Sequence, residues 1–120
     1  MPISPIRLQL AINGSVIATA GFEKFGVLSG ILTWVRRNPE KISEKMRQDP
    51  KFSEEEFLRE KLDVNLGGLD SVTDQHTWWA TLQVKAGDVV EIRVLGEGEF
   101  EEAARRQPDP VIPRSEGRAQ

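Results

Sequence analysis

Hydrophobic and polar residues alternate in several short stretches of the chain, a pattern typical of half-buried β-strands. The four expected strands are residues 6–12, 15–19, 62–66 and 89–95. Asn13-Gly14 separates the first two, and this pair tolerates the positive φ angles of a type I′ turn. A two-residue hairpin would place Leu10 opposite Ile17, so we expect both side chains on the core face.

A different hydrophobic period begins at Gly26. Apolar residues recur there at helical spacing, at Val27, Leu28, Ile31, Leu32 and Val35. This spacing predicts an amphipathic helix over residues 27–37. Arg36 and Arg37 suit its negative C-terminal end, and Asn38-Pro39 would stop it, because proline disfavours helical geometry in the preceding residue.

Residues 39–61 form a charge-dense insertion with few apolar anchors. Within it, Ser53-Glu54-Glu55-Glu56 matches a capping box, and Phe52 and Phe57 stand where a hydrophobic staple needs them. A short helix from about residue 54 to 61 is therefore predicted. We interpret the insertion as a lid or an extended connection.

The end of the chain carries three prolines and many charges and has no sustained apolar period. Such a segment cannot bury enough surface to offset the entropy lost on ordering. We therefore predict one α+β domain over residues 1–98, followed by a disordered tail over residues 99–120. The predicted element order is β-β-α-β-β, a mixed sheet with one principal helix packed on one face.

The element order, the Asn13-Gly14 turn and the segment LQVKAGDVVEIRVLGEG at residues 82–98 together resemble the β-grasp fold. This segment is similar to the closing part of ubiquitin-like and sulfur-carrier proteins. The resemblance implies a carrier or modifier function through a C-terminal diglycine. Here the corresponding residues are Gly96-Glu97-Gly98, with 22 residues beyond them, so a terminal diglycine is missing.

A second resemblance covers most of residues 8–95. GGLDS at 67–71, then His76, Trp78 and Leu82, then GDVVEIRV are similar to small bacterial proteins of unknown function. This resemblance implies no activity.

Composition argues against several classes of function. The 19 acidic and 16 basic residues are scattered, so no single-signed field attracts nucleic acid or an anionic membrane. Without cysteine there is no disulfide or thiolate chemistry, and a metal site would need Asp, Glu and the single His. The N-terminus lacks a signal-peptide pattern, and no apolar run is long enough to span a membrane. We expect a soluble, cytoplasmic protein without a cofactor.

The segment GGLDSVTDQHTWW, residues 67–79, contains most of the side chains that could act in catalysis or binding. We expect this segment to form a loop. Ser71, His76 and either Asp70 or Asp74 offer the residue types of a catalytic triad. They lie too close in one loop to be held by separate rigid elements. Asp70, Asp74 and His76 also lack the spacing of known zinc and calcium sites. The sequence therefore predicts neither a catalytic nor a metal site here.

Trp78 and Trp79 are adjacent, so the two indoles cannot share one environment on a strand. Trp78 shares its parity with Leu82 and Val84, so we expect Trp78 in the core and Trp79 on the surface. The alternative is that both indoles are partly buried under the 39–61 insertion.

Two hypotheses of function follow. The first is a non-catalytic protein-binding or adaptor module that contacts an unidentified protein through the open sheet face, with binding residues Trp79, His76, Asp70 and Asp74. The second is an enzyme or enzyme accessory with a site in the 63–79 loop, where Asp63 would join the polar residues. The first is favoured because no acid–base constellation with a defined spacing is present.

Overall fold

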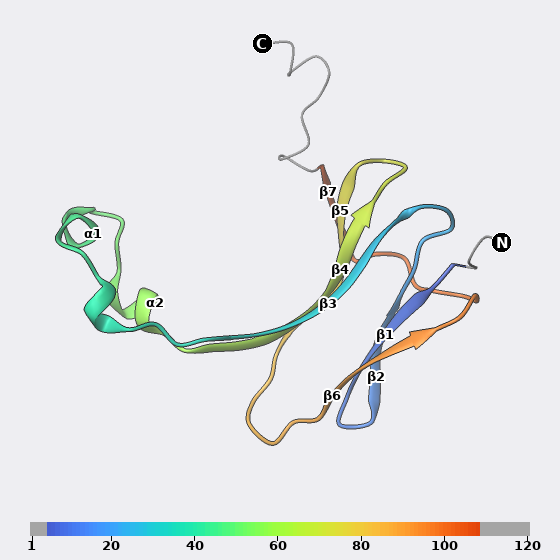
Figure 1. The fold of residues 1–120 in the computed structure, drawn as a ribbon, viewed down its shortest axis with the longest axis horizontal. Coiled ribbons are helices and arrows are strands. Elements are labelled where there is room, and N and C mark those ends of the chain that lie inside the picture. Colours follow the sequence, from blue (N-terminus) through green and yellow to red (C-terminus); the bar gives the residue numbers. More distant parts are fainter. Residues whose placement is uncertain (1–4, 109–120) are drawn as a thin grey trace, which may run out of the picture.

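The computed structural model describes residues 5–108, which form two antiparallel β-sheets packed face to face (Figure 1). The elements in chain order are β1 (Arg7–Ile12), β2 (Ser15–Ala20), β3 (Gly26–Val35), η1 (Pro39–Lys41), α1 (Glu44–Gln48), α2 (Glu54–Leu58), β4 (Lys61–Asp70), β5 (Gln75–Gln83), β6 (Val90–Leu95) and β7 (Arg105–Pro108). One sheet has the strand order β2-β1-β6, and the other has the order β3-β4-β5-β7.

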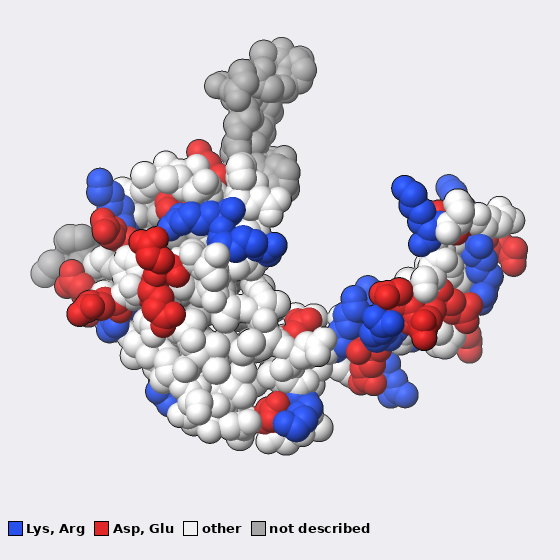
Figure 2. Space-filling view, turned by 180° about the vertical axis from the view of Figure 1, so that it is seen from behind, with Lys and Arg blue, Asp and Glu red and all other residues white. Residues whose placement is uncertain are grey.

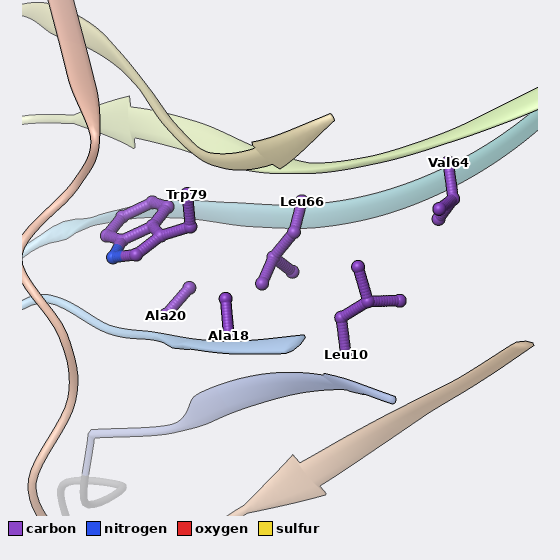
Figure 3. Packing of buried hydrophobic residues seen from close by; sticks show 6 residues of the cluster. All are labelled: Leu10, Ala18, Ala20, Val64, Leu66 and Trp79. Carbon is purple, nitrogen blue, oxygen red and sulfur yellow. The ribbon is translucent and has the colours of Figure 1, made fainter. Parts of the chain in front are cut away.

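The core lies between the two sheets. Figure 3 shows side chains of both sheets pointing toward one another, and the buried cluster consists of Leu10, Ala18, Ala20, Val64, Leu66 and Trp79. Phe22 packs against this cluster with its ring edge-on to the Trp79 indole, at 5.4 Å between centroids. Trp79 is the largest side chain in the cluster.

The expected α+β class was wrong, because the segment predicted as the principal helix is strand β3. All ten residues of β3 pair with β4, from Gly26 opposite Asp70 to Val35 opposite Lys61. Two glycines disfavour a helix here, and four β-branched residues favour a strand. The apolar period resembled a helix because β3 carries apolar side chains on both of its faces. The β-β-α-β-β order on which the β-grasp resemblance rested is therefore absent.

The first hairpin is confirmed, but its register differs from the prediction. Asn13 and Gly14 form the turn with φ angles of 52° and 86°. A β-bulge at Ile17 then shifts the pairing, so that Leu10 lies opposite Ala18. Ile17 is exposed and Ala18 is buried. An alternation pattern cannot show such an extra residue, which moves every later side chain to the other face.

The far parts of β3 and β4 leave the body of the protein as a two-stranded arm that carries η1, α1 and α2 at its tip (Figure 1). The 39–61 insertion is this tip, so it does not cover either tryptophan of β5. Figure 2 shows Lys, Arg, Asp and Glu of both signs gathered on the tip. The principal extents of the chain, 55 × 50 × 25 Å, reflect this projection.

The tip confirms the Ser53 half of the predicted capping box and the hydrophobic staple, while the Glu56 carboxylate accepts from Arg59. The Ser53 hydroxyl accepts a hydrogen bond from the Glu56 N–H, and the rings of Phe52 and Phe57 lie 5.8 Å apart. The Arg37 guanidinium lies 5.0 Å from the Phe57 ring and donates to the Phe57 carbonyl. The helix itself is shorter than predicted and ends at Leu58.

The predicted disordered tail begins too early. Residues 105–108 form β7 and pair with β5. The Glu101 N–H donates to the Thr19 carbonyl, and the Ala104 N–H donates to the Trp78 carbonyl. This segment is short and charged, but it closes one end of the core. The rest of the predicted tail, residues 109–120, lies outside the described residues.

Candidate binding surface on the four-stranded sheet

The two adjacent tryptophans have opposite environments, but in the reverse of the expected order. Trp79 is buried with 7% of its surface exposed, and its indole N–H donates to the Glu101 carbonyl at 2.7 Å. Trp78 is partly exposed and lies on the other face of β5. The β4–β5 register pairs Gly67 with Trp78 and Leu66 with Ala80, which leaves Trp79 as the extra residue of a β-bulge.

This bulge is the physical reason for the error. Leu82 and Val84 pack against the core, but the inserted residue inverts the parity between them and Trp78. The expectation that Trp79 lies on the surface was therefore wrong, and Trp78 is the more exposed of the two indoles.

Trp78 is held on the outer face of the sheet by two neighbours. The Arg105 guanidinium lies 4.0 Å from the centre of its indole. Gly67 lies directly opposite, and a Cβ placed there would come within 2.7 Å of the Thr77 carbonyl oxygen and 3.5 Å of the Trp78 ring. Gly67, which was expected in a loop, instead continues β4, and its lack of a side chain allows the close approach of the Thr77 carbonyl oxygen.

The outer face of the four-stranded sheet is apolar around Trp78. We call it the open face and define it by Val27, Ile31, Asn65, Leu69, His76, Trp78 and Arg105. Val27 and Ile31 alternate with Leu28, which packs against the core, so their side chains point away from it. They are 57% and 51% exposed. A shallow hollow of about 220 Å³ lies between Val27, Asn65, His76 and Trp78.

His76 belongs to this face, as its place in the predicted binding set requires. Its ring centroid lies 5.9 Å from that of Trp78, with the two ring planes tilted by 33°. In the sheet it pairs with Leu69 of β4. His76 therefore contributes a polar edge to a mainly apolar surface.

Asp70 and Asp74 shape the turn between β4 and β5. The Asp70 carboxylate accepts hydrogen bonds from the N–H groups of Val72 and Thr73 and from Arg106 at 3.1 Å. Burial raises the pKa of Asp70, but these hydrogen bonds and the Arg106 charge outweigh it and leave the pKa below its ordinary value. Asp74 takes the left-handed conformation, with a φ angle of 57°. Both residues therefore have structural roles in the turn.

The structure does not assemble the alternative catalytic site. Asp63 lies six residues along β4 from Leu69, the partner of His76, which amounts to about 20 Å in a strand. The Asp70 carboxylate is bonded to the backbone of its own turn and to Arg106. Within residues 5–108, no cluster of three or more His, Asp or Glu could hold a metal ion. The same residues contain no helix long and apolar enough to cross a membrane.

Comparison with protein-family models, with characterised proteins and with solved structures gave no match for this chain. A glycine opposite an aromatic residue across two strands is a known stabilising pair, and Gly67 with Trp78 is one. This signal was present in the sequence, but it could be used only once residues 67–70 and 75–79 were recognised as strands.

The lowered pKa of Asp70 makes a prediction about acid stability. Replacing Asp70 by Asn removes the charge that faces Arg106 and should cost about 1 kcal/mol of the free energy of unfolding near neutral pH. Because the folded-state pKa is depressed, this contribution is present above the unfolded value of about 3.9 and disappears as the pH falls through the folded value. Thermal melts across this pH range should show the gap between wild type and Asp70→Asn closing in acid.

Asp74→Asn is the matched control, since it removes one carboxylate from the same turn. Near neutral pH it should cost less than Asp70→Asn, because it leaves the contact between Asp70 and Arg106 in place. A gap for Asp70→Asn that stays constant down to low pH would contradict the role given to the carboxylate.

Proposed function

We propose that this protein is a non-catalytic protein-binding module that holds a partner protein against the open face. The observation that carries the proposal is the position of Trp78, between Arg105 and Gly67, on a sheet face that no other strand or helix of residues 5–108 covers. An indole held in place loses little conformational freedom on binding, and tryptophan and arginine are enriched among residues that dominate interface energies.

The shape and charge of the surface favour a protein over other ligands. Val27 and Ile31 extend the apolar area away from Trp78. The hollow between Val27 and Trp78 is shallow, whereas small-molecule sites are deep and concave. The net charge of −3 does not favour nucleic acid or an anionic membrane. We place this binding in the cytoplasm, because a chain without cysteine suits a reducing compartment.

Affinity capture from the native host with three forms of the chain tests the proposal. The wild type should retain a partner protein, and Trp78→Ala should bind that protein at least about tenfold more weakly. Such a loss corresponds to a hot spot of over about 1 kcal/mol. Trp34→Ala is the matched control, because it removes a 61% exposed indole from the arm and should retain the partner. Equal recovery by the wild type and Trp78→Ala, with both folded, would reject the open face as the binding surface.

A further inference from the structure

The outer edge of β3 differs from every other strand edge of the described residues. β3 is ten residues long and lies at the edge of its sheet, so one side of its backbone has no neighbouring strand. Its sequence, GVLSGILTWV, contains no charged residue and no proline. Ile31, Leu32 and Trp34 are each more than half exposed. Long, apolar, uncharged edges pair readily with another strand.

The other three edges carry the features that prevent such pairing. β2 is interrupted by the bulge at Ile17. β6 presents Glu91 and Arg93, which form an ion pair at 3.3 Å. β7 is four residues long, begins with two arginines and ends in Pro108. Protection of three edges and not the fourth indicates that β3 is kept open for a strand.

The hydrogen bonds at its ends show which β3 residues face outward. The Phe25 carbonyl accepts from the Ser71 N–H, and on the far side of β4 the Leu62 carbonyl accepts from the Val84 N–H. In an antiparallel ladder, bonding to a neighbour alternates along the strand. The odd-numbered residues of β3 therefore bond to β4, and the even-numbered ones direct N–H and C=O away from it. These outward residues are Gly26, Leu28, Gly30, Leu32 and Trp34.

Every second residue of β3 faces outward, with Gly30 at the centre, so the edge can pair antiparallel with a second copy along most of its length. We propose that two copies of this chain pair through β3 about a two-fold axis at Gly30, joining their four-stranded sheets into one. The cross-strand pairs would be Gly26 with Trp34, Leu28 with Leu32, Val27 with Thr33 and Ser29 with Ile31. No pair brings charges together, and Leu28 meets Leu32 on each side of the axis. Closed two-fold dimers are the commonest assemblies of identical chains, and pairing about Gly30 gives such a closed dimer.

The area available sets the strength of the pairing. Val27, Ile31, Leu32 and Trp34 expose a few hundred Å² of apolar side chain on each copy, which falls toward the low end of specific interfaces. The dimer therefore dissociates on dilution. Sedimentation of the wild type over a dilution series should show a shift from twice the 13.5 kDa chain mass toward the single mass.

Proline at position 32 tests the edge itself. The Leu32 N–H faces away from β4, so Leu32→Pro removes a donor to the second copy and none of the bonds to β4. We expect this variant to be monomeric at concentrations where the wild type is dimeric. Val94→Lys is the control, because it changes a 70% exposed side chain of β6, away from the β3 edge. This variant should remain dimeric. Circular dichroism establishes that both variants are folded.

Cysteine pairs test the register and do not depend on the proline variant folding. The chain has no cysteine, so introduced thiols have no competitor. Opposed residues 29 and 31 would lie about 4.5 to 5.5 Å apart between Cα atoms, within reach of a disulfide. A mixture of Ser29→Cys and Ile31→Cys chains should give a disulfide-linked dimer on mild oxidation, and each variant alone should not, because identical positions lie more than about 7 Å apart.

Three results would overturn the proposal. The first is a wild type that remains monomeric at every concentration, even if its β3 edge binds a strand of another protein. The second is a dimer that survives folded Leu32→Pro. The third is equal disulfide formation by the single variants and the mixture. Trp78→Ala separates the two proposals, because Trp78 belongs to the open face but not to the β3 edge and its removal should leave the dimer intact.

Discussion

Replacing Trp79 by Ala should remove roughly 3 to 5 kcal/mol of the free energy of unfolding, a large part of what a domain of this size has. Trp79 is the largest member of the core cluster, contacts the Phe22 ring and donates to the Glu101 carbonyl. The loss of stability has two causes. The substitution leaves a large cavity, and it removes the hydrogen bond from the indole to the Glu101 carbonyl. Denaturant melts at neutral pH measure it directly.

Trp78→Ala is the matched control, because it makes the same substitution at the adjacent position. Its indole is partly exposed and touches Arg105, so its removal should cost about 1 kcal/mol. The asymmetry between the two variants tests the β-bulge. Equal losses, or a greater loss for Trp78→Ala, would mean that the bulge is misplaced.

Local features of the chain were predictable where a few neighbouring residues decide the conformation. The Asn13-Gly14 turn and the Ser53 cap depend on backbone angles and hydrogen bonds within about four residues, and both are confirmed. β4 and β6 were recognised from alternation, although β4 extends further than predicted. These elements need no knowledge of what packs against them.

The errors arose where distant parts of the chain decide the outcome. β3 is a strand because it pairs along its whole length with β4, a partner some 35 residues away in sequence. Its apolar residues serve the core on one face and the open face on the other, which produced a false helical period. The roles of Trp78 and Trp79 were exchanged because one inserted residue changes the parity of β5. Alternation within a single strand contains no information about its partner's register.

The segment after β6 illustrates the same limit and carries the last prediction. The segment was predicted to be disordered because it has little apolar surface. It is ordered because it packs over one end of a core that other strands form. The Glu101 backbone both donates to the Thr19 carbonyl and accepts from the Trp79 indole, while Phe100 packs over Gly21. The carboxylate of Glu101 also accepts from the Thr19 N–H. Glu101 thus joins β2 of one sheet to β5 of the other.

A chain that ends at Gly98 should therefore lose at least about 3 kcal/mol, since the part-buried bond of the Trp79 indole, the backbone bonds to Thr19 and Trp78 and the cover over Trp79 disappear together. Its melting temperature should fall by more than about 10 °C. A chain that ends at Pro108 is the matched control, because it keeps β7 and every contact named for residues 99–108. Thermal melts of the two truncated forms beside the full chain give the comparison. If the form ending at Gly98 melted within about 5 °C of the form ending at Pro108, the closing segment would contribute less than ~1 kcal/mol and the Trp79 indole would be buried without it.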